Sequence, residues 1–149
     1  MRTRYILIFT LLFMAISNAQ SNQFQLNKDH DAIQVKDLKA SAKFYGDVLG
    51  LKEIPNGGLP AHIRWFQLGN AVQIHLIESD SIPENQKGVH MALNTNNLQE
   101  VMKFLKEKDI HFENWTGEVE TTNTRPDGIK QIYLQDPDGY WIEINDGSL

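Results

Sequence analysis

The chain contains an internal repeat: residues 30–54 align without a gap on residues 90–114, at an offset of sixty positions. The two segments share the same or similar residues at five positions, namely His30 and His90, Ala32 and Ala92, Ile33 and Leu93, Leu38 and Leu98, and Phe44 and Phe104. Segments with a common pattern of apolar residues form the same elements in the same order. A chance likeness between two α+β segments is the alternative, but we favour a true duplication, which predicts two copies of one structural module.

Each copy begins with an alternating strand and continues into a helix. Apolar residues recur at helical spacing near 38–49 and 98–108, so we expect a helix in both places. Asp37 and Asn97 stand at equivalent positions before these helices, where side chains that accept hydrogen bonds from the first turn are favoured. Gly50 follows the first helix, where a glycine commonly ends one.

After the helix, each copy returns to strands. The expected strands are two short runs at 53–55 and 111–115, and two pairs of longer alternating runs at 62–68 with 71–78 and at 130–135 with 140–144. The sequences "GN" and "DPDG" between the paired runs are hairpin signals. The element order is therefore β-α-β-β-β, twice, which predicts an α+β fold of two βαβββ modules. We place the modules at about 28–79 and 88–147, with a polar linker at 80–87 and a long polar loop at 115–128.

Residues 1–19 have the build of a secretory signal peptide. Two arginines form a basic start, an apolar run follows at 5–16, and small residues precede Gln20 at the positions that a signal peptidase requires. The apolar run is short for a membrane span, and no cysteine follows that could carry a lipid. We therefore expect cleavage and export, most simply to a periplasm. Release from the cell and an uncleaved membrane anchor are the alternatives.

The remaining chain has the composition of one compact acidic domain. It has no cysteine, and the full sequence is 41% hydrophobic and 22% charged. Loss of the leader leaves 12 Lys and Arg against 19 Asp and Glu, which changes the formal net charge from −5 to −7. An acidic chain without a basic cluster is a poor partner for nucleic acid or for anionic membranes. A cysteine nucleophile is excluded, and we expect a small-molecule partner.

Four residues with metal-binding side chains occupy equivalent places in the two modules. His30 and His90 open the first strand of each module, whereas His75 and Glu143 lie on the last strand, each after an isoleucine. If the modules pack with pseudo-twofold symmetry, these side chains converge, and three imidazoles with one carboxylate suit a divalent transition metal. A lone strand histidine is more often a structural group, and a lone glutamate more often faces water. The coincidence of residue type and place favours the metal site.

The two other histidines and the two arginines outside the leader do not belong to this pattern. His62 and His111 have no counterpart in the repeat, so we interpret both as structural. Arg64 and Arg125 are the two arginines that remain after the leader is removed. We favour ordinary surface solvation for both, although Arg125 lies in the long loop, which could fold over the site as a lid.

Four motifs together resemble the vicinal oxygen chelate superfamily, which includes glyoxalase I, methylmalonyl-CoA epimerase, extradiol dioxygenases, and fosfomycin and bleomycin resistance proteins. The motifs are "DHDAIQVKDLKASAKFYGDVLGL", "FQLGNAVQIHLIE", "HMALNTNNL" and "IYLQDPDGYWIEI". The resemblance covers residues 28–147. It implies a glyoxalase-like fold in which two βαβββ modules close a cup-shaped sheet around a metal site.

The resemblance also implies a ligand set. In that superfamily the metal ligands come from the first and last strands of each module, which implies His30, His75, His90 and Glu143. It further implies that Glu143 can leave the metal to act as a catalytic base. The position of His75 is typically glutamate in bacterial glyoxalase I and glutamine in the epimerases, so this chain departs from both. Extradiol dioxygenases and fosfomycin enzymes use three ligands, which match His30, His90 and Glu143.

We therefore expect an exported, metal-dependent lyase or isomerase of glyoxalase type, acting on a small substrate that chelates the metal through two vicinal oxygens. The candidate metals are Zn, Ni, Co, Mn and Fe(II). An Fe(II) dioxygenase of extradiol type is the first alternative. A binding protein that sequesters a small toxin or drug in the same cleft is the second.

A single module cannot close the site, because a curved four-stranded sheet leaves half of a barrel open. Two modules that face each other close it, either within one chain or between two chains, and the linker at 80–87 permits both routes. The resemblance implies dimers with sites at the subunit boundary. We expect a symmetric homodimer in which His30 and His75 of one chain meet His90 and Glu143 of the other.

The leader gives a direct prediction: protein recovered from its native export route begins at Gln20, unmodified or cyclised to pyroglutamate. N-terminal mass analysis checks this. Recovery of intact Met1 in the membrane fraction would contradict it.

Overall fold

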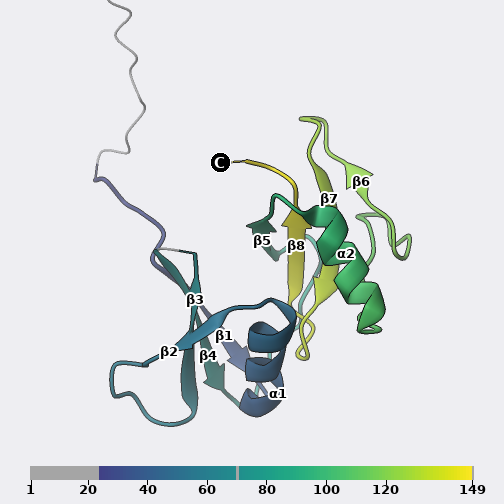
Figure 1. Cartoon of the computed structure of the whole chain (residues 1–149). Coiled ribbons are helices and arrows are strands. Elements are labelled where there is room, and N and C mark those ends of the chain that lie inside the picture. Colours follow the sequence, from purple (N-terminus) through teal and green to yellow (C-terminus); the bar gives the residue numbers. More distant parts are fainter. Residues whose placement is uncertain (1–23, 70, 149) are drawn as a thin grey trace, which may run out of the picture.

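The structure, a computed structural model, describes residues 24–69 and 71–148, so the leader expected at 1–19 lies outside the described residues. Among the described residues, no helix is long and apolar enough to cross a membrane. Figure 1 shows the elements, which are β1 (His30–Val35), α1 (Leu38–Lys43), η1 (Phe44–Val48), β2 (Lys52–Ile54), β3 (Ile63–Leu68), β4 (Val72–Glu78), β5 (His90–Asn94), α2 (Leu98–Glu107), β6 (Asn123–Thr124), β7 (Lys130–Gln135) and β8 (Trp141–Asn145).

The strands form two separate sheets with the same topology. Their orders are β1-β4-β3-β2 and β5-β8-β7-β6, and in each sheet the first and last strands of the module are parallel neighbours. The registers are also equivalent, because Ala32 lies opposite His75 and Ala92 lies opposite Glu143. The predicted α+β fold of two repeated modules is therefore confirmed. Within one chain the described strands form no closed barrel.

The local signals at the helix ends act largely as expected. Asp37 accepts a hydrogen bond from the backbone nitrogen of Ala40 at 2.9 Å, which caps α1. Asn97 occupies the equivalent position before α2 but makes no capping hydrogen bond with its side chain within the described residues. Gly50 follows the first helix with a φ of +67°, a left-handed conformation that glycine adopts without steric cost. The single helix expected at 38–49 consists of α1 followed by the π-helical turn η1.

The second module departs from the sequence prediction at one edge. The strand expected at 111–115 is reduced to bridges at Glu113, and the fourth strand of the sheet is β6, inside the segment expected to be a loop. The buried amide of Asn114 explains the difference. Its oxygen accepts hydrogen bonds from the backbone nitrogens of Thr116 and Glu118, both within 3.0 Å. These bonds fold the chain into a turn directly after Glu113, so a regular strand cannot continue.

One hydrophobic core lies on the helix-covered faces of both sheets. It unites buried residues of the first module with buried residues of the second, namely Val35, Leu38, Ala42, Tyr45, Phe66, Ile74 and Leu76 with Leu98, Leu105, Phe112, Ile132, Leu134, Ile142 and Ile144. In Figure 1, α1 lies against the first sheet and α2 against the second. Because strand side chains alternate between faces, each sheet also has a second face that carries no helix of its own module. We call these the open faces.

The "DPDG" turn between β7 and β8 ties the second module to the first. Asp136 accepts a hydrogen bond from the hydroxyl of Tyr45 at 3.0 Å. Asp138 accepts hydrogen bonds from the Ser41 hydroxyl and the Lys36 backbone nitrogen, both at 3.0 Å. Asp136 and Ser41 are buried, and burial raises the pKa of Asp136 above its usual value. Buried contacts of this kind fix how the two modules lie relative to each other.

We predict that Tyr45→Phe lowers the free energy of unfolding by about 1–3 kcal/mol, because a buried carboxylate loses a hydrogen-bond donor. The loss should be largest above the pKa of folded Asp136. It should shrink as the pH falls and this carboxyl becomes protonated, because a neutral carboxyl depends less on the donor. Urea unfolding at several pH values measures both effects.

The double variant Tyr45→Phe/Asp136→Asn is the control for this interaction. If the hydroxyl acts through Asp136, the two changes together should cost less than the sum of their separate costs. A strictly additive pair, or a loss that grows in acid, would contradict the assignment.

Candidate functional site

The four candidate ligands lie on the open faces, and the parallel strand pairs bring them together two by two. His30 on β1 stacks against His75 on β4, with ring centroids 4.2 Å apart and an interplanar angle of 14°. His90 on β5 lies against Glu143 on β8, with Nε2 and Oε2 3.2 Å apart. The equivalent register of the two sheets thus places each strand-opening histidine beside the candidate ligand of its own module.

The first pair belongs to a stack of three rings. The ring of His75 lies between His30 and Trp65, and its centroid is 4.2 Å from that of each neighbour. His75 Nε2 is 2.8 Å from Oε1 of Gln73, and His30 Nδ1 is 2.6 Å from the Asp29 carboxylate. Burial lowers the pKa of His75, and the neighbouring imidazole of His30 lowers it further. These effects favour the neutral imidazole, which is the form that binds metals.

The indole of Trp65 is held by this stacking and not by a hydrogen bond. Within the part of the chain that the structure describes, its Nε1 is buried and has no hydrogen-bond partner. Such an orphaned donor is rare, because its desolvation is not compensated. The Trp65 ring therefore packs against the face of the His75 ring opposite His30.

The second pair centres on a buried carboxylate, since Glu143 is only 4% exposed. Its Oε2 accepts a hydrogen bond from the Tyr133 hydroxyl at 2.8 Å, and its Oε1 accepts one from the Asn145 amide at 2.7 Å. Arg125 Nη1 lies 3.5 Å from Oε1. Gln131, with its amide nitrogen turned toward Glu143, lies 3.2 and 3.3 Å from the two oxygens. Four side chains therefore hold the Glu143 carboxylate in one orientation.

The geometry of His90 leaves one ring nitrogen for a cation. Its Nδ1 is 2.8 Å from the carbonyl oxygen of Lys87, and because a carbonyl can only accept, Nδ1 carries the proton. Nε2 then faces Glu143 Oε2, which already accepts from Tyr133. Two electron pairs this close repel each other unless a proton or a metal ion lies between them. An imidazole nitrogen and a carboxylate oxygen are also typical ligands of a divalent transition metal, so this donor set fits such an ion.

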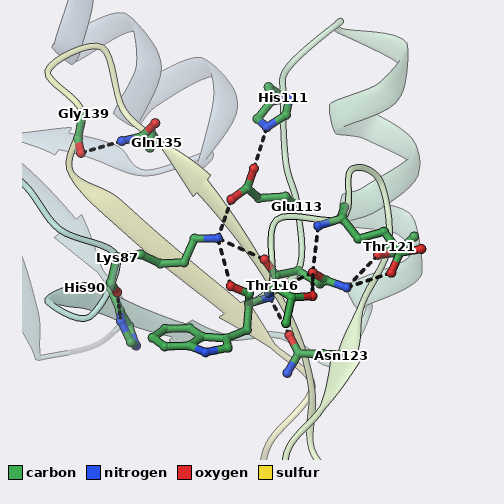
Figure 2. Close-up of polar contacts among 12 residues, drawn as sticks. Lys87, His90, His111, Glu113, Thr116, Thr121, Asn123, Gln135 and Gly139 are labelled. Atoms are coloured by element: carbon green, nitrogen blue, oxygen red, sulfur yellow. Dashed lines mark hydrogen bonds and ion pairs between the residues drawn. The ribbon is translucent and has the colours of Figure 1, made fainter.

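A polar cluster lies next to His90. Figure 2 shows the ammonium of Lys87 reaching Glu113, which also contacts His111. Lys87 Nζ donates to the carbonyl oxygens of Asn114 and Trp115 at 3.0 and 3.3 Å as well. The hydrogen bonds from Lys87 and His111 lower the pKa of Glu113. His111 therefore contacts Glu113, and its expected structural role stays a prediction.

Within the described residues, no group of three or more His, Cys, Asp or Glu side chains lies close enough together to hold a metal ion. The four candidate ligands form two pairs, and each pair lies on its own sheet. One chain therefore presents the candidate shell as two separate halves.

Several neighbours of the candidate ligands were not predicted from the sequence. Arg125, for which we favour surface solvation, is partly exposed and pairs with Asp127, but its guanidinium also lies 3.5 Å from Glu143 Oε1. Trp65 and Tyr133 could have been found. They are 68 residues apart, as are His75 and Glu143, and each is the cross-strand partner of one of those two residues.

Comparison with known proteins identifies the family. The model of the Glyoxalase/Bleomycin resistance protein/Dioxygenase superfamily matches residues 28–144. Protein YwbC of Bacillus subtilis is 32% identical over 123 residues, which cover 78% of this chain and 94% of YwbC. The metallothiol transferase FosB of Staphylococcus epidermidis is 30% identical over 128 residues, which cover 81% of this chain and 82% of FosB.

Solved structures share the fold. The oxidase ChaP-H2 superposes with a TM-score of 0.68 at 22% identity, covering 83% of this chain and 94% of the oxidase. Lactoylglutathione lyase from Agrobacterium tumefaciens superposes with a TM-score of 0.64 at 21% identity, covering 81% of this chain and 93% of the lyase. The family model, which spans most of the described residues, confirms the resemblance noted from the sequence motifs. The chain belongs to the Glyoxalase/Bleomycin resistance protein/Dioxygenase superfamily.

Proposed function

We propose that this protein is a metal-dependent lyase or isomerase of glyoxalase type, and that its substrate is a small molecule chelated through two neighbouring oxygens. The proposed ligands are His30, His75, His90 and Glu143. The observation that carries the proposal is the His90–Glu143 pair, whose facing nitrogen and oxygen are 3.2 Å apart while the other ring nitrogen is committed to a backbone carbonyl. A divalent cation satisfies both groups at once.

We propose further that the site forms between two chains of a symmetric homodimer. Three observations support this: each sheet has an open face, the candidate ligands divide between the two open faces, and the "DPDG" turn fixes the modules of one chain to each other. Pairing the first open face of one chain with the second open face of another would bury both and bring the two pairs of ligands together. A twofold axis makes two such sites.

In this proposal a bound divalent cation would act as a Lewis acid that polarises an oxygen of the substrate. Glu143 would be the proton acceptor through Oε2, which faces the ring of His90. Asn145 and Arg125 lie against its other oxygen, Oε1. Burial and the neighbouring carboxylate raise the pKa of Tyr133 well above its usual value, so this residue stays a neutral donor. Tyr133 and Asn145 would thereby hold Glu143 in place while it receives the proton.

A second candidate function is an Fe(II) dioxygenase that uses His30, His90 and Glu143 alone. One observation favours it: the ring of His75 lies between two other rings, and its Nε2 already contacts Gln73. Two histidines and one carboxylate with open positions are the usual ligands of non-heme Fe(II) in oxygenases.

Metal analysis of purified protein distinguishes the candidate functions. Zinc, nickel, cobalt or manganese near one per chain supports the first, iron supports the second, and absence of metal supports a small-molecule binding protein.

Export to a periplasm remains part of the proposal, and it is supported by the basic and apolar pattern of residues 1–19. An extracytoplasmic site would meet small oxygenated compounds from outside the cell. Fractionation of cells that express the full chain tests this, because the processed protein should be released with the periplasmic contents.

We predict that His90→Ala and Glu143→Ala each abolish metal binding, because each residue would supply one metal bond that the remaining proposed ligands cannot replace. Calorimetric titration of each variant with Zn²⁺ or Co²⁺ measures the effect. His62→Ala is the matched control, since this histidine is exposed and lies outside the proposed shell. His75→Ala decides between the two ligand sets: a large loss of affinity supports four ligands, and nearly unchanged affinity supports the three-ligand dioxygenase.

Mixing variants tests the sharing of ligands between chains. A dimer of one His30→Ala chain and one His90→Ala chain should hold one intact site and one doubly defective site. Metal binding should therefore return to half of the sites in the mixed dimer, whereas each variant alone binds none. If every chain builds its own site, mixing restores nothing, and this proposal fails even if the protein is a dimer.

A further inference from the structure

Lys87, at the end of the linker between the modules, contacts the candidate site with both its backbone and its side chain. Its carbonyl oxygen accepts the hydrogen bond from His90 Nδ1 at 2.8 Å. Its ammonium forms an ion pair with Glu113 and donates to the carbonyl oxygens of Asn114 and Trp115. One residue therefore links the strand-opening histidine of β5 to the loop at 113–115.

The side chain of Lys87 is held tightly for a lysine. The side chains of Lys87 and Glu113 are each 17% exposed, so their ion pair is largely shielded from solvent. The ammonium also lies over two rings of the open face, 4.6 Å from the centroid of Trp141 and 5.5 Å from that of Tyr133. Partly desolvated ion pairs and cation–π contacts are stronger than their exposed counterparts. An anchored side chain of this kind restricts the backbone that carries it.

The backbone between Lys87 and His90 forms a tight turn. The backbone nitrogen of Val89 donates to the carbonyl of Gln86 at 2.8 Å, so residues 86–89 are closed by their own hydrogen bond. The side chain of Val89 is 80% exposed and contributes little packing. The anchor of this turn is therefore Lys87, whose carbonyl faces the ring of His90.

We propose that Lys87 is a positioning residue, which holds the loop at 113–115 and the ring of His90 as one unit and directs His90 Nε2 toward Glu143. The ion pair with Glu113 fixes the turn, the turn fixes the Lys87 carbonyl, and the carbonyl keeps the proton on Nδ1. The consequence for metal binding rests on the proposed function, but the effect on the His90 ring does not. Trp115, which lies edge-on to His90 with ring centroids 6.5 Å apart, is held in place by the same contacts.

The test compares three variants by nuclear magnetic resonance of metal-free protein labelled with ¹⁵N-histidine, at one fixed pH. Lys87→Met keeps the apolar stem and removes the ammonium, whereas Lys87→Arg restores the charge. Lys106→Met is the matched control, because Lys106 also pairs with a glutamate, Glu120, and also lies over a phenylalanine ring, but far along the chain from His90. The ¹⁵N shifts of the two ring nitrogens report which nitrogen carries the proton.

Wild-type protein and the Lys106→Met variant should both show a protonated Nδ1 at His90. In Lys87→Met, the Nδ1 signal of His90 should lose the shift of a hydrogen-bonded N–H, and the indole signal of Trp115 should shift. Lys87→Arg should restore the wild-type pattern at least in part. A folded Lys87→Met variant with an unchanged His90 pattern would overturn the proposal. If Lys87→Met does not fold, Glu113→Gln is used in its place, and it should give the same change at Nδ1 of His90.

A second measurement separates this proposal from the proposed function. Titration with Co²⁺ should show at least a tenfold loss of affinity in Lys87→Met and none in Lys106→Met. If the wild-type protein binds no Co²⁺ but His90 still changes in Lys87→Met, the positioning role stands and the metal-dependent function fails. If the wild-type protein binds Co²⁺ and neither His90 nor the affinity changes in Lys87→Met, the metal site stands and the positioning role fails.

Discussion

Two carboxylates in one turn set the relation between the modules. Asp136 and Asp138 stand in a four-residue turn of the second module, yet each also accepts hydrogen bonds from the first module. The donors there are the hydroxyls of Tyr45 and Ser41 and the backbone nitrogen of Lys36. These contacts join the modules on the side where the helices cover the sheets, and the shared apolar core lies on that side as well. The open faces, with their imidazoles and the Glu143 carboxylate, are consequently left for other contacts.

The two open faces share one geometry but differ in chemistry. Trp65 and Tyr133 occupy equivalent positions opposite His75 and Glu143. In the first module this place holds a ring that stacks on the candidate ligand, whereas in the second it holds a hydroxyl that hydrogen-bonds to it. One face therefore presents a stack of rings, and the other presents a carboxylate held by hydrogen-bond donors. In the proposed dimer, a substrate between the two faces would contact rings on one side and a carboxylate on the other.

The repeat made much of the fold predictable, because strands, helices and their caps follow from local periodicity and from residues such as Asp37 and Gly50. The pairing of His90 with Glu143 was also accessible, since equivalent strands must occupy equivalent places. The strand expected at 111–115 was wrong because a single buried amide, that of Asn114, turns the chain. Alternation of apolar residues carries no information about such a side-chain bond.

The surroundings of the candidate ligands were less accessible for a similar reason. Arg125 and Lys87 lie in polar segments, where the charge pattern alone indicates only solvated surface. Their contacts depend on partners 18 and 26 residues further along the chain, Glu143 and Glu113, and these partners are recognisable only once the sheet register is known. Burial of a carboxylate beside hydrogen-bond donors is a property of three-dimensional packing and has no local signature.

The position of Lys87 has a consequence for how this family member can change in length. Segments between modules usually tolerate insertions and deletions, because little packs against them. In this chain the segment that can change in length ends before Gln86. Residues 86–89 form a hydrogen-bonded turn, and this turn carries the Lys87 carbonyl that accepts from His90. Length variation among relatives with the same lysine should therefore concentrate at 80–85, and the two residues between Lys87 and His90 should keep their number.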